Sequence, residues 1–232
     1  MDFVSKLEED LAGASGLLVQ SMLAGAERHG LLVVTAGVLW DSRDHETTPS
    51  KGMLHDLSLR GGAGLGPNLG YGGLNATFRF YTRLYKEFLV FAARGLLDVL
   101  VGDPPFYELS RHGGLGAGDT TGGGKSIRGV GGQRFLGKIK LLLNAELRSK
   151  FFHFRIKTHR FNVGGVAFVD AGRVWTDGKT RRELDGLNFG LKVGVGGGLR
   201  IQWGEHFLVG ADFAYSPADG NLGVYIDVDH AF

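Results

Sequence analysis

The sequence has no cysteine and no long hydrophobic run. Without cysteine among its 232 residues, the chain can form neither a disulfide framework nor a thiolate metal site. Its 8 histidines include no helical pair with metal-ligand spacing, so the sequence predicts no metal site and no bound cofactor. No run of about 18 apolar residues is present, which excludes a transmembrane helix.

An excess of charge of one sign is also missing. The 26 basic and 24 acidic residues are interspersed and leave a net charge of +2, so the sequence predicts no nucleic-acid partner. No nucleophile, base and orienting group stand in a recognisable pattern, so the sequence predicts a protein that is not an enzyme. The residues after Met1 are mixed and partly acidic, and no signal peptide is expected in this chain.

Glycine, by contrast, is abundant, with 40 residues, and it dominates the segment GGGKSIRGVGGQRF at 122–135. Gly124-Lys125-Ser126 is similar to the end of a phosphate-binding loop, but Asp119 stands where that motif requires a glycine. The motif also requires a following helix, and each of the glycines after Ser126 would cost such a helix about 1 kcal/mol. We therefore interpret this segment as a loop with another role.

From about residue 31 onward, apolar residues alternate with polar or small ones over long segments. In the clearest segment, Leu191, Val193 and Leu199 share one face, and Lys192 and Arg200 share the other. Segments of about ten residues fit strands that cross a bilayer better than the strands of about five or six residues in soluble sandwiches. The expected strands lie at about 31–41, 52–61, 72–82, 87–98, 139–148, 162–174, 189–203, 207–215 and 222–232.

These nine strands predict an all-β fold, an antiparallel transmembrane β-barrel over residues 31–232 with its apolar face toward lipid. A soluble ligand-binding β-barrel is the alternative. Residues 1–30 differ, because Val4, Leu7 and Leu11 recur at helical spacing. They predict a short N-terminal helix, with an extracellular loop as the alternative.

Three motifs in order resemble the BamA and TamA type of outer-membrane proteins, the bacterial surface antigen family. WDSRDHETTPSKG at 40–52 resembles the family's aspartate-rich strand end and periplasmic turn. GGGKSIRGVGGQRF resembles its inward-folded loop, whose usual core is Val-Arg-Gly-Phe, although Ile127 and Val130 replace the first and last of these residues. FVDAG at 168–172 resembles the Asp-x-Gly motif of a later barrel strand.

The resemblance implies that residues 99–136 fold into the lumen of the barrel and place Arg128 there. Glu146 lies on the inward face of its predicted strand, and the family pattern also places Asp170 inward. Both carboxylates are expected to pair with Arg128, because a guanidinium can bind two carboxylates at once. The loop motif comprises Gly123, Gly124, Ser126, Ile127, Arg128 and Gly129, and the strand motif comprises Phe168, Asp170 and Gly172.

The end of the chain resembles the outer-membrane sorting signal, in which alternate hydrophobic residues lead to a final aromatic residue. His230 departs from that pattern, because an apolar or aromatic residue usually stands two positions before the end. The residues that fit it are Val224, Ile226, Val228 and Phe232.

The family resemblance implies an outer-membrane protein of the insertase or translocase type, which inserts other barrels or moves polypeptides across the membrane. Its expected partners are outer-membrane lipid, unfolded outer-membrane or secreted polypeptides, and periplasmic or barrel-assembly subunits. Because the family barrel has sixteen strands, we expect the chain to hold the C-terminal part of such a barrel, with the signal peptide and further domains elsewhere. The alternative within the family is the membrane anchor or pore of a lipid-hydrolase fusion.

Overall fold

The computed structural model of the chain describes residues 29–64, 69–86, 88–115, 119–176, 190–205, 207–217 and 220–232. The helix or loop expected for residues 1–30 lies almost wholly outside this part of the chain. In the described part, no helix combines the length and apolar character that crossing a membrane requires.

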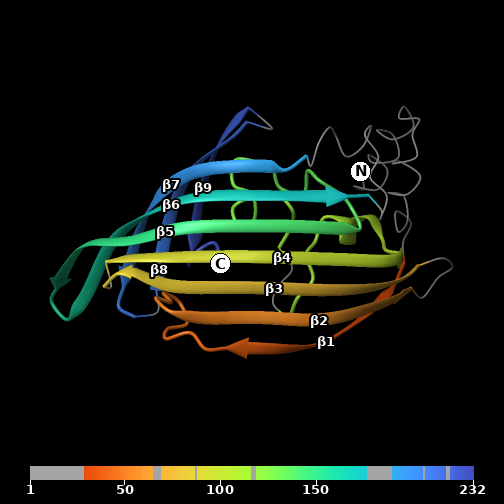
Figure 1. Cartoon of the computed structure of the whole chain (residues 1–232), viewed down its shortest axis with the longest axis horizontal. Helices are drawn as coiled ribbons and strands as arrows, with labels where there is room; N and C mark the ends of the chain where they lie inside the picture. The colour runs from red at the N-terminus through yellow and green to blue at the C-terminus, as the bar shows by residue number, and fades with distance from the viewer. Residues whose placement is uncertain are drawn as a thin grey trace.

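One antiparallel sheet holds all the strands of the described residues, each paired with its neighbours in the sequence (Figure 1). The sheet is open, since β1 and β9 form its two edges. The strands are β1 (Leu31–Asp41), β2 (Gly52–Gly64), β3 (Gly70–Tyr85), β4 (Leu89–Asp103), β5 (Ile139–Ile156), β6 (His159–Trp175), β7 (Lys192–Trp203), β8 (Phe207–Ser216) and β9 (Asn221–Val228).

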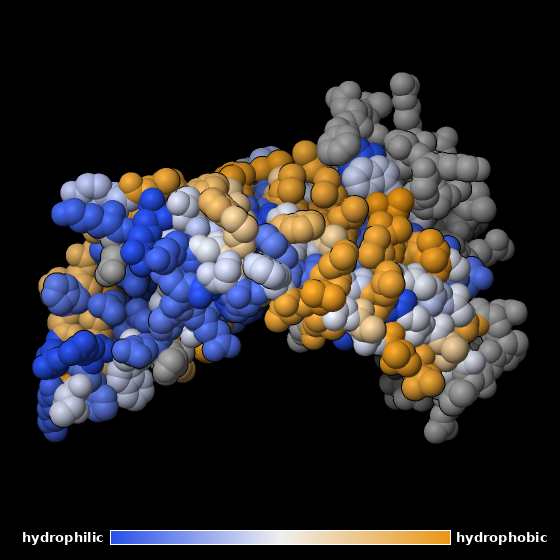
Figure 2. All heavy atoms as spheres, turned by 60° about the horizontal axis from the view of Figure 1, so that its bottom comes forward, coloured by the Kyte–Doolittle hydropathy of each residue, from blue (hydrophilic) through white to orange (hydrophobic). Residues whose placement is uncertain are grey.

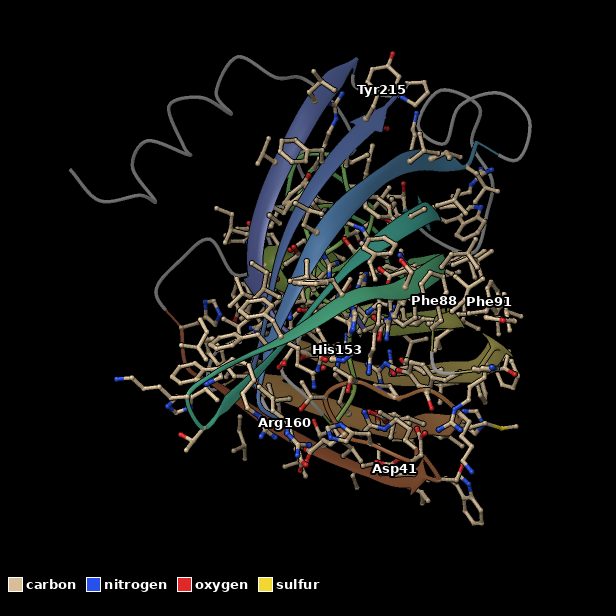
Figure 3. All side chains as sticks on the ribbon, turned by 90° about the vertical axis from the view of Figure 1, so that its left-hand side faces the viewer. Asp41, Phe88, Phe91, His153, Arg160 and Tyr215 are labelled. Carbon is tan, nitrogen blue, oxygen red and sulfur yellow. The ribbon has the colours of Figure 1, made fainter. Side chains whose placement is uncertain are left out.

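All nine expected strands are present, but β5 and β6 are longer than predicted, with 18 and 17 residues. The β4 pairing of β5 ends at Ser149, and the β7 pairing of β6 begins at Phe161. Residues 155–160 therefore project beyond both neighbouring strands as a two-stranded ribbon, at the end of the sheet where Figure 3 labels His153 and Arg160. A register shift between Lys150 and Phe152 breaks the alternation there, which is why the sequence pattern ended the strand early.

The two faces of the sheet differ in chemistry as the alternation predicts. On β7, the side chain of Leu199 is 60% exposed and that of its neighbour Arg200 only 5% exposed. Exposed large apolar side chains occur on every strand of the sheet, whereas a soluble protein rarely exposes a large contiguous apolar surface. On the face drawn in Figure 2, hydrophobic side chains gather over the middle and right, and hydrophilic ones dominate the left end.

The inner face of the curved sheet is covered by the segment between β4 and β5, which crosses behind the strands in Figure 1. This segment, here called the lumen loop, covers residues 104–138 and starts later than expected because β4 continues to Asp103. It contains the short 3-10 helix η1 (Phe106–Leu109) and one isolated bridge between Arg111 and Thr120. Ile127 and Val130 of the loop pack with Leu96 and Leu142 of the sheet in a small apolar cluster. At position 130 valine thus fills the core where the resembled family carries phenylalanine.

Candidate functional site

The tip of the lumen loop is a tight turn built on glycine. The Gly123 N–H donates to the carbonyl of Val130 at 3.0 Å, which closes residues 123–130 into a compact unit. Gly123 and Gly129 have φ of +100° and +87°, a region that side chains strongly disfavour. The turn holds Ser126, Ile127 and Arg128 against the sheet, each exposed by at most 1%.

Arg128 is the centre of the site, and its side chain is completely buried. Its Nε and Nη2 donate to the two oxygens of Asp170 at 2.7 and 2.9 Å, a bidentate pair. Its Nη2 also lies 2.7 Å from Oε1 of Glu146. The structure thus brings together the loop arginine on 104–138, Glu146 on β5 and Asp170 on β6, the three residues that the sequence motifs singled out.

Two features of this cluster hold the guanidinium in one orientation. The ring of Phe168 lies against it, with 3.3 Å between Cζ of Arg128 and the ring centroid, a cation–π contact. Asn144 on β5 donates to Asp170 and to the carbonyl of Ser126, both at 2.7 Å, so the same amide fixes the acid and the loop backbone. Strands β5 and β6 position all of these side chains on the inner face of the sheet.

Asp212 on β8 is a third acidic partner that the family motifs did not indicate. Nη1 of Arg128 donates to its Oδ2 at 3.0 Å, and Nη2 of Arg200 donates to the same oxygen at 3.0 Å. The signal available in the sequence was its inward position in the alternation of β8, which gives a face but no partner. Tyr225 on β9 was missed as well, and its hydroxyl accepts the Gly129 N–H at 2.9 Å.

Glycines in the sheet allow the loop backbone to approach it closely. A Cβ atom added to Gly194 on β7 would overlap the carbonyl oxygen of Arg128. A Cβ added to Gly172 on β6 would stand 2.7 Å from Cδ1 of Ile127, and one added to Gly124 would stand 3.1 Å from the ring of Tyr225. Gly172 of the strand motif therefore serves the packing of the loop, and it also lies within β6 rather than at its end.

The chain end does not continue the alternation of β9. Because β9 ends at Val228, Phe232 is not on the outward face that it shares with Val224 and Ile226 in the sequence pattern. The ring of Phe232 instead lies 5.0 Å from Cζ of Arg94 and 5.1 Å from Cζ of Arg148, on the lumen side. An oxygen of the terminal carboxylate of Phe232 accepts a hydrogen bond from Nη2 of Arg148 at 2.8 Å. The outward part of the expected sorting signal is thus limited to the residues of β9.

A second group of ion pairs holds the other part of the lumen loop. Asp98 on β4 accepts Arg60 at 3.0 Å, Lys140 at 2.8 Å and the backbone N–H of Gly113 at 2.9 Å. His112, beside Gly113, is buried and within 3.0 Å of the Thr121 hydroxyl. Burial, together with the positive charges of Lys140 and Arg94, lowers the pKa of His112 to about 3.

Comparison with known proteins identifies the family of this chain. The Omp85 superfamily domain matches residues 20–224. The chain belongs to the Omp85 superfamily. Among solved structures, the chain is similar to BamA from Haemophilus ducreyi lacking POTRA domains 1-3, with a TM-score of 0.60 and 19% identity. The similarity covers 85% of this chain and 42% of that one, so the chain spans about two fifths of the BamA structure.

The Omp85 assignment and the structural likeness agree with the BamA and TamA resemblance of the three motifs. The chain is an outer-membrane β-barrel protein of this type, which replaces the alternative of a soluble ligand-binding barrel. Curated proteins include no match to it. Among the described residues, no group of three or more His, Asp or Glu side chains is arranged to hold a metal ion.

The geometry of the Omp85 site suits a clamp. Strands β5, β6 and β8 each supply one carboxylate to Arg128, so the loop is tied to the sheet over a width of four strands. Charges buried in this way are stable as a matched set, and removal of one partner leaves an uncompensated charge.

Proposed function

We propose that the chain forms part of a barrel that assists the insertion of outer-membrane proteins. In this function the lumen loop fixes the curvature of strands β5 to β8, to which Arg128 ties it. The edge strand β9 then receives an incoming strand by backbone pairing. The observation that carries the proposal is the Omp85 match together with the few contacts that tie β9 to the rest of the described sheet. A strand edge that opens presents a row of backbone donors and acceptors to an incoming strand.

The contacts of β9 support its role as the movable edge. It is an 8-residue strand, the shortest in the described sheet, and it pairs with β8 alone. It contacts the lumen loop through the Tyr225 hydroxyl, which accepts the Gly129 N–H, and through an ion pair between Lys125 and Asp227 at 3.6 Å. The strands beneath the Arg128 clamp are held by shorter, buried ion pairs. An edge with fewer ties can separate at lower cost while the clamp keeps the rest of the lumen in shape.

The proposal predicts contact between β9 and a substrate polypeptide. A photo-crosslinking residue at Ile226, on the outward face of the edge strand, should capture an unfolded outer-membrane protein during its insertion into phospholipid vesicles that contain this chain. The same residue at Leu199, which is also outward but lies on β7 between two strands, is the matched control. Equal capture at both positions would contradict templating at the edge.

A functional assay separates insertion from the other function within the family. Vesicles that contain the chain should speed the folding of a urea-unfolded outer-membrane protein relative to empty vesicles. A barrel that serves only to anchor a lipid hydrolase has the same fold and would leave that folding rate unchanged.

A further inference from the structure

A cavity lies at the end of the sheet opposite the lumen loop. Its volume is about 230 Å³. Its walls come from the β1–β2 turn, the ends of β3 and β7, the starts of β4, β6 and β8, the middle of β5, and His230. Figure 3 views the molecule from this end, where the β5–β6 ribbon projects. Four cationic side chains line the cavity, and they are Arg83, Arg148, Lys150 and Arg200.

Two of these arginines are buried, and each has an N–H group without a hydrogen-bond acceptor. Arg148 is 6% exposed and donates through Nε to Glu146 and through Nη2 to the terminal carboxylate of Phe232. Arg200 is 5% exposed and donates through Nη1 and Nη2 to Asp212. Within the described part of the chain, Nη1 of Arg148 and Nε of Arg200 have no acceptor. A buried donor without an acceptor is unfavourable, and these two belong to residues that share one cavity wall.

Carboxylates pair with three of the cations that line the cavity. Asp44 pairs with Arg83 at 3.0 Å, and Glu146 and Asp212 pair with Arg148 and Arg200 from behind the wall. The terminal carboxylate of Phe232 also accepts from Arg148, so four cations meet four carboxylates, and an anion site here depends on the two donors without an acceptor. Glu146 and Asp212 are shared further with Arg128, which has Asp170 as an acid of its own.

We propose that this cavity binds a small oxyanion of the phosphate class. The two unpaired N–H groups are guanidinium donors, which match the oxygens of a phosphate better than a halide ion. Gln202 and Asn162 add amide groups to the same wall, where they bond to each other at 3.2 Å. The volume is several times the roughly 30 Å³ of a water molecule, so the cavity accepts a phosphate group together with a few waters.

Such a group has two sources, free phosphate or the headgroup of a phospholipid, and both present the same oxygens to the arginines. Calorimetric titration of the full chain in a non-ionic detergent distinguishes them. Inorganic phosphate is one titrant and glycerol 3-phosphate, which stands for a lipid headgroup, is the other. Binding of inorganic phosphate supports a free-anion site, and binding of glycerol 3-phosphate alone supports a headgroup site. No heat beyond that of sodium chloride at equal ionic strength, for either titrant, overturns the proposal.

Variants of the wall test whether the binding occurs in this cavity. Arg200→Gln should weaken binding about tenfold, because it removes a charged donor. Arg200 also holds Asp212, so Lys150→Gln provides a second variant at an exposed position, with an expected loss of about threefold. Lys157→Gln, at the exposed tip of the same ribbon but outside the cavity, is the matched control and should bind as the wild type does. Equal weakening by Lys150→Gln and Lys157→Gln would place the anion on the general surface charge and refute the site.

Discussion

Replacement of Arg128 by alanine removes the central cation of the lumen clamp, and its three acids are affected unequally. Glu146 keeps Arg148 as a partner at 2.8 Å, and Asp212 keeps Arg200. Asp170 keeps the side-chain amide of Asn144 at 2.7 Å and the backbone N–H of residue 128 at 3.1 Å, but it keeps no cation. Asp170 therefore bears most of the loss, as a buried carboxylate that is 0% exposed and has no cation beside it.

The expected destabilisation follows from this inequality. Breaking a buried ion pair by removing one partner costs about 3–5 kcal/mol. Because two of the three acids keep a cation, we expect the lower end of that range, about 3 kcal/mol, for Arg128→Ala. The double variant Arg128→Ala with Asp170→Asn removes the unpaired charge as well and should recover about 1–2 kcal/mol of this loss.

Two measurements check the prediction. Urea unfolding of the membrane-inserted chain, followed by tryptophan fluorescence, should show a lower midpoint for Arg128→Ala and partial recovery for the double variant. Trypsin should cut after Lys125 in the loop faster than in the wild type, with the site identified by mass spectrometry. Arg134→Ala, at an exposed position of the same loop, is the control and should match the wild type in both assays. The reasoning is refuted by a wild-type midpoint and a wild-type cutting rate in Arg128→Ala.

Three further predictions concern other parts of the lumen and the outer face. Burial lowers the pKa of His112 to about 3, below the value of about 6.5 in an unfolded chain. The neutral buried imidazole therefore contributes to folding stability above pH 6.5, and this contribution is lost as the pH falls toward 3. Between these two pKa values, His112 should lower the free energy of unfolding by about 1.4 kcal/mol for each unit of falling pH. In His112→Gln, the free energy of unfolding should therefore depend less steeply on pH in this acid range. Gly194→Ala should loosen the loop and raise trypsin cleavage after Lys125, because its Cβ overlaps the Arg128 carbonyl, whereas Gly132→Ala, whose Cβ meets nothing within 4 Å, should not. Leu199→Arg on the exposed apolar face should destabilise the inserted barrel by about 2–4 kcal/mol in urea titrations, and an unchanged midpoint would contradict a lipid-facing position.

The alternation of the sequence determined the strands and their two faces. Side chains of a strand point to opposite sides by geometry alone, so Leu199 outward and Arg200 inward follow from the order of residues. The pattern failed where that geometry is interrupted, at the register shift that lengthens β5 and at the end of β9, beyond which Phe232 lies inside. Alternation carries no information on where a bulge or a strand end lies.

The inward face of Glu146 and the motif around Arg128 could also be derived from the sequence, because one follows from alternation and the other from family resemblance. The ion pair between Arg128 and Asp212 could not be derived from the sequence, although Arg128 was placed on the loop and Asp212 on the inward face of its strand. Contact between residues 84 positions apart depends on the curvature of the whole sheet and on the absence of a side chain at Gly194, which lets the loop reach β8. The sequence by itself therefore determined which side each residue faces, since that is a local property of strands. Only the tertiary structure decided which inward charges meet, since that depends on how far the sheet curls around its loop.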